Sequence, residues 1–286
     1  ILRGSSGREF LISTYCCHPS MGNDNLSGMV LWALLLRNLR GRELRHTYRF
    51  VIAPETIGAI AYLGRNQEEM RGVEGGFVVT TVAGPGAFGY KTSFAGNSIV
   101  DTVARLTFAE RGLEFFEYPF DIKGSDERQY SSPYFRIPMG IICKDKFYEY
   151  AYYHTSLDNL DFIKPEYLLE TLALYEAAID KLECDRAYRS LMPYGEPMLG
   201  KRGLYPSVGG MIAQSAAAGS REHDTRLYEG ADKGITGNEL DSMLWLMFHA
   251  DGKTTLVDMA EQVGLPVRLL ADAAEKLVDA GLVEPV

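Results

Sequence analysis

Residues 9–39 read EFLISTYCCHPSMGNDNLSGMVLWALLLRNL and show the pattern that indicates the fold class most clearly. Residues 9–14 (EFLIST) have the length and the apolar, β-branched character of a buried strand. Residues 25–39 carry apolar side chains nearly all round a helix, as a helix buried in a core does. A buried strand, a polar loop and a buried helix in direct succession are typical of an α/β protein.

The same alternation of strands and helices continues to about residue 190. Further strands are predicted at 47–53, 76–82, 114–119 and 138–143, and further helices at 57–65, 97–111 and 165–183. Pro165 stands in the first turn of the last helix, where its missing N–H costs nothing. Strands separated by helices predict a mostly parallel mixed sheet covered by helices, in a domain of residues 1–190.

The rest of the chain has a different pattern. Residues 191–235 are rich in Gly and Pro and show no apolar period, so we expect a connecting segment there. Residues 236–286 return to helical periodicity, with a short turn at Gly264–Pro266 and a Leu-Val pair near the end. This order predicts a helix-turn-helix or winged-helix module.

Composition narrows the class of protein. The 286 residues carry a net charge of −9, so the basic surplus of a nucleic-acid binder is absent. No apolar run is long enough for a membrane span. Four cysteines without a CxxC pair indicate reduced thiols in a cytoplasmic protein. The chain starts at Ile1 and opens almost directly into a strand, so we expect that part of the natural N-terminus is missing from it.

Three short segments carry side chains suited to chemistry. His18 and Asp24 follow the first predicted strand, at the strand end where open α/β sheets bind ligands. Glu55 directly follows the strand 47–53, and His154 lies in the aromatic segment YAYYHTSLDNLD. Taken singly, each also fits a structural role, as a helix cap, a partner of a helix dipole or a hydrogen-bonded loop residue.

Together, the three segments resemble the zinc aminopeptidases. Typical members hold two zinc ions through an early His, a bridging Asp, a Glu-Glu pair and a late His in a YHT segment. More closely, residues 1–286 resemble an aminopeptidase-like branch of uncharacterised function with a C-terminal winged helix. The matching sequence segments are CCHPSMGNDNLSG, APETIGAIAYL, GSDERQYSSPYF, YYHTSLDNLDFI and GEPMLGKRGLYP. The resemblance implies a zinc exopeptidase-like fold, hydrolysis of an amide or peptide bond, and an inserted segment before Ile1.

Two departures from the two-zinc pattern affect the expected number of metal ions. The glutamate pair is replaced by Glu55-Thr56, and Thr80 and Thr81 stand where an aspartate is typical. Neutral side chains such as those of Thr56 and Thr81 hold a dication weakly. The pattern that remains implies one zinc ion.

The resemblance assigns three protein ligands to this ion, with the fourth position open for catalysis. They are His18, Asp24 and His154. Glu55 is expected to take the proton of the zinc-bound water and to pass it to the leaving amine.

The same resemblance places other side chains next to a small peptide or amide substrate. The loop GSDERQYSSPYF lies by the active site, so Asp126 or Glu127 is a candidate for binding a substrate ammonium. Arg128 is a candidate for binding a carboxylate in bidentate geometry, and these alternatives stay open. Tyr153 is a candidate hydrogen-bond donor to the developing oxyanion.

Two other functions are alternatives to a hydrolase. Missing ligands also fit a degenerate binder of an amino acid or peptide, although the retained Glu55 favours an enzyme. A winged helix suggests a DNA-binding regulator, but residues 236–286 hold nine acidic and three basic side chains. Because carboxylates repel phosphates, we expect no nucleic-acid partner, and we also expect no membrane partner. The large apolar side chains of this module predict a homo-oligomer.

Overall fold

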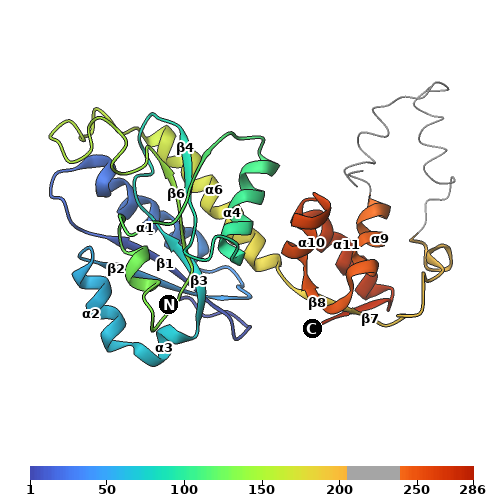
Figure 1. Ribbon diagram of the computed structural model, residues 1–286. Coiled ribbons are helices and arrows are strands. Elements are labelled where there is room, and N and C mark those ends of the chain that lie inside the picture. The colour runs from blue at the N-terminus through green and yellow to red at the C-terminus, as the bar shows by residue number, and fades with distance from the viewer. Residues whose placement is uncertain (205–238) are drawn as a thin grey trace, which may run out of the picture. The chain divides into compact units, whose positions relative to one another are not determined.

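The structure, a computed structural model, describes residues 1–204 and 239–286 (Figure 1). The residue contacts divide the chain into two units, Ile1–Glu183 and Cys184–Val286, and each is described by itself below. Most of the predicted connecting segment, 191–235, lies outside the described residues. Its described part includes the short 3-10 helix η2 (Leu199–Arg202).

A six-stranded mixed sheet forms the centre of the first unit, with the strand order β2-β1-β3-β6-β4-β5. Its strands are β1 (Glu9–Tyr15), β2 (Thr47–Ala53), β3 (Val73–Val78), β4 (Phe88–Lys91), β5 (Phe116–Tyr118) and β6 (Met139–Lys144). β1 pairs in parallel with β2 and β3, β3 pairs in parallel with β6, and β4 runs antiparallel to β6. The carboxyl ends of β1, β2, β3 and β6 therefore meet at one edge of the sheet. The predicted mostly parallel sheet is confirmed.

Helices cover both faces of this sheet (Figure 1). They are the helical turn η1 (Gly22–Ser27) and the helices α1 (Gly28–Leu39), α2 (Ile57–Arg65), α3 (Gln67–Arg71), α4 (Ile99–Glu110), α5 (Glu127–Tyr130) and α6 (Pro165–Cys184). Side chains alternate between faces along a strand. Accordingly, Val78 of β3 packs in a cluster with Leu63 of α2, whereas its neighbour Phe77 packs edge-to-face against Tyr175 of α6.

Several elements differ from the sequence prediction, among them the short helices α3 and α5, which the prediction lacks. The strand predicted at 76–82 ends at Val78, and Thr81 then adopts a left-handed φ of 49°, which an extended strand does not allow. The helix predicted at 25–39 begins at Gly28, because Asp24 and Asn25 have non-helical dihedrals. β4 has no counterpart in the prediction, since a four-residue strand next to Gly-Pro-Gly reads as a loop.

Where the structure describes it, the second unit contains a three-stranded antiparallel sheet and three α-helices besides η2. The strands β7 (Ala187–Ser190), β8 (Asp251–Thr255) and β9 (Val283–Pro285) have the order β8-β7-β9. The helices are α9 (Glu239–His249), α10 (Leu256–Val263) and α11 (Val267–Asp279). Thr255 and Asp258 form a capping box at the start of α10, and Gly264 ends that helix with a φ of 70°. The order of helices and strands agrees with the predicted winged-helix module. Among the described helices, none is both long and apolar enough to cross a membrane.

Candidate metal centre

The candidate site is built from loops that leave the carboxyl ends of parallel strands. His18 and Asp24 follow β1, Glu55 follows β2, Thr80 follows β3, and His154 lies in the long loop after β6. Ligands of open α/β sheets bind at this edge because the loops of neighbouring parallel strands converge there. The topology thus brings together side chains from distant parts of the sequence, such as Asp24 and His154, which are 130 positions apart.

Two histidines converge on one carboxylate oxygen. Oδ2 of Asp24 lies 3.1 Å from Nε2 of His154 and 3.6 Å from Nδ1 of His18. The centroids of the two imidazole rings are 4.3 Å apart. The Asp24 side chain is 1% exposed, whereas those of His18 and His154 are 24% and 42% exposed, so the cluster is open to solvent on the histidine side.

The donor set fits a tetrahedral zinc ion. Ligand atoms at about 2.0–2.1 Å from a tetrahedral zinc lie about 3.3 Å from one another. The separations from Oδ2 given above are close to this value, and one ligand atom from each of His18, Asp24 and His154 lies within 4.8 Å of the others. Imidazole and carboxylate ligands are usual in catalytic zinc sites, which keep one coordination position open. These residues therefore have the chemistry and spacing that such an ion requires.

A buried tyrosine binds the other oxygen of Asp24. The Tyr15 hydroxyl donates to Oδ1 of Asp24 at 2.7 Å and lies 2.6 Å from the hydroxyl oxygen of Thr80. Burial, followed by the charges of Asp24 and Glu55, raises the pKa of Tyr15 well above its usual value, so the hydroxyl keeps its proton. Burial also raises the pKa of Asp24, while the Tyr15 hydrogen bond and the His18 charge lower it.

Asp158 fixes the loop that carries Asp24. Its carboxylate accepts the backbone N–H of Asn23 at 2.6 Å and that of Asp24 at 3.0 Å. The Tyr150 hydroxyl donates to the same carboxylate at 2.9 Å, and Asp158 is fully buried. Sequence reasoning misses Tyr15, which reads as the end of a buried strand, and gives no role to Asp158. The position of Asp158 in the YHTSLDNLD segment is the signal that points to it.

Cys17 contacts both Glu55 and His18 and so links Glu55 to the same cluster. The Cys17 thiol donates to Oε2 of Glu55 at 3.2 Å, and its sulfur lies 2.9 Å from Nδ1 of His18. Ligand atoms of the three residues lie within 4.8 Å of one another. Burial and the hydrogen bond to Glu55 raise the pKa of Cys17, so the thiol acts as a donor and not as a thiolate. The structure places Glu55 next to the histidine cluster.

Backbone strain is concentrated at the candidate site. His18, Thr56, Thr81 and His154 have φ values of 54°, 61°, 49° and 56°, in a region that residues other than glycine rarely adopt. Such conformations cost of the order of 1–3 kcal/mol each and gather at functional sites. The surrounding fold therefore stabilises conformations here that the local sequence does not favour.

The three charged residues of the loop GSDERQYSSPYF have different surroundings. Asp126 is buried, and its Oδ1 accepts the backbone N–H of Thr56 at 2.7 Å. Glu127 is also buried and forms an ion pair with Nζ of the buried Lys91 at 2.9 Å. Arg128 is exposed. The structure thus brings Asp126 to the turn after β2, whereas the charge of Glu127 is balanced inside the protein.

Tyr153 lies against a candidate metal ligand. Its ring stacks on the imidazole of His154, with centroids 3.8 Å apart and an interplanar angle of 16°. Burial and the charge of Asp24 raise the pKa of Tyr153, so its hydroxyl is a neutral donor. This contact orients the His154 ring.

A cavity of about 480 Å³ opens beside His18. Its size lies within the range of small-molecule sites. Apart from His18, the side chains that line it are uncharged, and they include Cys16, Met21, Leu26, Met29 and Leu160.

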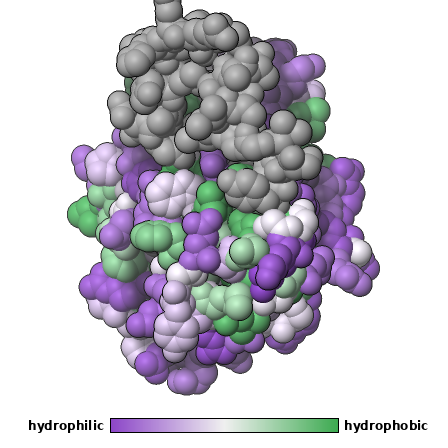
Figure 2. All heavy atoms as spheres, turned by 90° about the vertical axis from the view of Figure 1, so that its right-hand side faces the viewer, coloured by the Kyte–Doolittle hydropathy of each residue, from purple (hydrophilic) through white to green (hydrophobic). Residues whose placement is uncertain are grey.

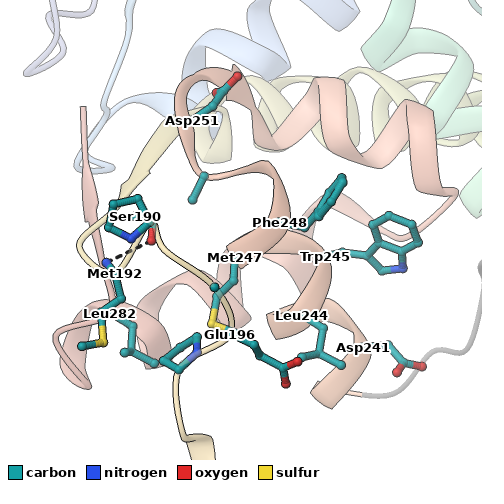
Figure 3. Close-up of a pocket in the computed structure, with 14 residues that line it drawn as sticks. Ser190, Met192, Glu196, Asp241, Leu244, Trp245, Met247, Phe248, Asp251 and Leu282 are labelled. Atoms are coloured by element: carbon teal, nitrogen blue, oxygen red, sulfur yellow. Dashed lines mark hydrogen bonds between the residues drawn. The ribbon is translucent and has the colours of Figure 1, made fainter.

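A separate cavity of about 790 Å³ lies within the C-terminal unit (Figure 3). The segment after β7, with Met192 and Glu196, faces α9, with Leu244 and Met247, and the Met192 N–H donates to the Ser190 hydroxyl at 3.1 Å. Its described lining residues include three carboxylates but no histidine or cysteine, so it lacks the paired imidazole ligands of the candidate metal centre. On the face drawn in Figure 2, apolar side chains occur in small groups between hydrophilic ones.

Comparison with known proteins identifies the family. The family described as "Domain of unknown function (DUF4910)" matches residues 1–185, and a "winged helix-turn-helix" family matches residues 186–222 and 227–285. A Clostridium acetobutylicum protein, provisionally named for polysaccharide biosynthesis with an aminopeptidase-like domain, is 34% identical over 285 residues. The match covers 100% of this chain and 60% of that protein, so this chain spans less than two thirds of the relative's length.

Solved structures extend the comparison. A crystal structure of a provisionally named peptidase from Clostridium acetobutylicum matches with a TM-score of 0.83 at 32% identity, over 100% of this chain and 59% of that chain. An aminopeptidase from Aneurinibacillus sp. strain AM-1 matches with a TM-score of 0.55 at 17% identity, over 63% of this chain and 46% of that chain. BSAP, a zinc aminopeptidase from Bacillus subtilis, matches with a TM-score of 0.51 at 18% identity, over 62% of this chain and 47% of that chain. The last two likenesses concern the fold alone. This chain belongs to the DUF4910 family: its family domain has an aminopeptidase-like fold, and a winged helix-turn-helix domain follows it.

Proposed function

We propose that this chain contains the catalytic domain of a zinc-dependent hydrolase that cleaves an amide or peptide bond in an aminopeptidase-like reaction. The observation that carries the proposal is the convergence of His18 and His154 on Oδ2 of the buried Asp24. A second carboxylate, that of Glu55, lies within reach of the same histidine. Metal ligands with an open side and a neighbouring proton acceptor are what this class of hydrolysis needs.

The arrangement of Asp24 supports a single zinc ion per chain. A carboxylate bridges two metal ions through both of its oxygens, and here Oδ1 accepts the Tyr15 hydroxyl. His18 and His154 both approach the other oxygen, Oδ2, so they face one common position. The neutral side chain of Thr56, next to Glu55, adds no strong ligand for a second ion.

The residues around the metal position supply the remaining chemistry. A bound zinc ion lowers the pKa of water and polarises the substrate carbonyl. The Glu55 carboxylate accepts the proton of the attacking water and passes it to the nitrogen of the leaving amine. The Cys17 thiol holds Oε2 of that carboxylate. The Tyr153 hydroxyl is the candidate donor to the oxygen on which negative charge develops.

The charged residues at the start of α5 are the candidate contacts of the substrate. Arg128 is exposed and is the candidate for binding a substrate carboxylate in bidentate geometry. Asp126 and Glu127, which the sequence pattern offers as candidates for binding an ammonium group, are buried and hydrogen-bonded within the protein, so we propose neither as a substrate contact. The substrate class is a small peptide or amide. Because one relative is named for polysaccharide biosynthesis, amides on amino sugars belong in the same test.

Two substitutions test this proposal on the zinc-loaded chain, with a panel of aminoacyl anilides, dipeptides and N-acylated amino sugars. Glu55→Gln is expected to keep its zinc and to lose turnover by about 100-fold or more, as for removal of a general base. His18→Ala is expected to lose zinc. Glu68→Gln, which changes an exposed glutamate of α3, is the matched control and should behave as the parent chain.

Two outcomes would contradict the proposal. If Glu55→Gln loses zinc but keeps turnover, Glu55 is a ligand and not the base. If the parent chain binds zinc but hydrolyses no member of the panel, a peptide- or amino-acid-binding role replaces the hydrolase.

For the C-terminal unit, we propose protein contacts within a homo-oligomer in place of DNA binding. Of the three basic residues in 236–286, Arg268 is paired with Asp272 at 2.9 Å, and Lys276 is paired with Glu239. Both bases thus have a carboxylate beside them, and carboxylates repel phosphates. Phe248 of α9 is 79% exposed, and a large exposed aromatic side chain favours burial against another protein surface.

A further inference from the structure

The turn that carries Glu55 has a strained backbone. Thr56 has a φ of 61° and a ψ of −67°, and the N–H of Ile57 donates to the carbonyl of Glu55 at 2.6 Å. A hydrogen bond from residue i+2 to residue i with these dihedrals defines a γ-turn of the rare, strained kind. Such a turn persists only where the surrounding structure supports it.

A residue from a distant part of the chain contacts the centre of this turn. The N–H of Thr56 donates to Oδ1 of Asp126 at 2.7 Å, across 70 positions of sequence. Asp126 is fully buried, and its other oxygen, Oδ2, has no hydrogen-bond partner among the residues that the structure describes. Asp126 stands at the N-cap of α5, yet its side chain does not cap that helix. The hydrogen bond to Thr56 is thus the evident contribution of this carboxyl group.

The loop that carries Asp126 is itself held in place. Oε1 of Glu127 accepts Nζ of Lys91 at 2.9 Å, and Oε2 of Glu127 accepts the N–H of Ser125 at 3.0 Å. A Cβ atom at Gly124 would lie 1.9 Å from Oε1 of Glu127, so only glycine allows this close approach. Because Lys91 and Glu127 are both fully buried, Asp126 is presented to the Thr56 turn by a fixed support.

We propose that Asp126 is a positioning residue that holds the Thr56 γ-turn and thereby aims the Glu55 carboxylate at the histidine cluster. The proposal rests on the proposed role of Glu55 as the general base. It assigns to Asp126 an action through Glu55 and not a contact with the metal or with the substrate.

The test compares Asp126→Asn, which keeps an acceptor oxygen for Thr56, with Asp126→Ala, which removes it. Asp121→Ala, in the half-exposed carboxylate that also contacts Lys91, is the matched control. In the zinc-loaded chain, Asp126→Ala is expected to lower kcat about 10- to 100-fold with little change in KM, because a small misplacement of a catalytic group is costly. Asp126→Asn and Asp121→Ala are expected to keep kcat within about threefold of the parent, as no catalytic group moves. All variants should keep the parent's zinc content.

A second readout does not depend on activity. In protein labelled with ¹⁵N-threonine, the Thr56 amide should exchange slowly with solvent in the parent and in Asp126→Asn, and quickly in Asp126→Ala. If Asp126→Ala is too unstable to study, Asp126→Glu displaces the acceptor while keeping the charge and should show the same loss. If Asp126→Ala keeps the parent's kcat in the same assay in which Glu55→Gln is inactive, the positioning role is overturned and the proposed function stays intact. Full activity of Glu55→Gln contradicts the proposed function itself, whatever the Thr56 amide shows.

Discussion

The Tyr15 hydroxyl donates to Oδ1 of Asp24, and the opposite oxygen of the same carboxylate faces His18 and His154. The two oxygens of Asp24 therefore have different roles: Oδ1 accepts a structural hydrogen bond, and Oδ2 is the candidate metal ligand. The Thr80 hydroxyl, 2.6 Å from the Tyr15 oxygen, fixes the direction of the donor. Because only one oxygen of Asp24 is left to bind a metal ion, we propose a single zinc position.

Tyr15→Phe tests the role of this hydrogen bond. Loss of a partner that orients a metal ligand typically weakens metal binding about 10- to 100-fold, and we expect a loss of that size in zinc affinity. Tyr90→Phe is the matched control, because the buried Tyr90 hydroxyl also donates to Oδ1 of a buried aspartate, Asp101, at 2.7 Å. Both variants lose a buried hydrogen bond, but only Tyr15→Phe should weaken zinc binding in a competition titration with a chelator. Equal zinc affinities for the two variants would show that Tyr15 has no role in orienting Asp24.

The ionisation of Asp126 predicts a pH-dependent stability. Burial first, and then the charges of Glu55 and Glu127, raise the pKa of Asp126 from 3.8 to about 7, against the lowering by the Thr56 N–H and by Arg128. The folded state therefore binds this proton more tightly than the unfolded state. The stabilisation is complete below about pH 4 and is lost as the pH rises to about 7.

Asp126→Asn cannot ionise and lacks this pH dependence. A tenfold difference in proton affinity is worth about 1.4 kcal/mol. As the pH rises from about 4 to about 7, the free energy of unfolding of the variant should therefore increase by a few kcal/mol relative to that of the parent. Urea denaturation of both chains at several pH values measures this difference. A difference that does not change with pH, or that falls as the pH rises, would contradict the assignment.

The charge pattern of α11 predicts that the winged helix does not bind DNA. This helix carries Asp272, Glu275 and Asp279, which repel phosphates. Titration of the full chain with a mixed-sequence duplex at physiological salt should show no salt-sensitive binding. Reversal of these three charges to Lys should create weak, salt-sensitive binding. Tight binding by the parent chain would show that the charges of α11 do not decide the partner.

The sequence predicted the sheet and its covering helices because their apolar periods are long and uninterrupted. Residues 9–14 and 47–53 were predicted as strands, and β1 and β2 have nearly the same bounds. The prediction failed where local signals are weak. β4 spans four residues beside Gly and Pro, and Thr81 leaves the strand direction through a left-handed φ that only tertiary contacts stabilise.

The candidate site was predictable only in part, for a similar reason. His18, Asp24, Glu55 and His154 stand at strand ends or in a distinctive segment, so their positions in the sequence point to them. Tyr15 acts through a contact that exists only in the folded chain, and its place at the end of a buried strand gives no local sign of that contact.

The most direct test of the proposed metal centre is the zinc content of the full chain, measured by elemental analysis after dialysis against metal-free buffer. A site formed by His18, Asp24 and His154 predicts about one zinc ion per chain, and its loss in His154→Ala. His249→Ala, in the histidine of the last turn of α9, is the control and should keep the ion. Two tightly bound zinc ions per chain, or none after supplementation with zinc, would contradict the single-zinc centre.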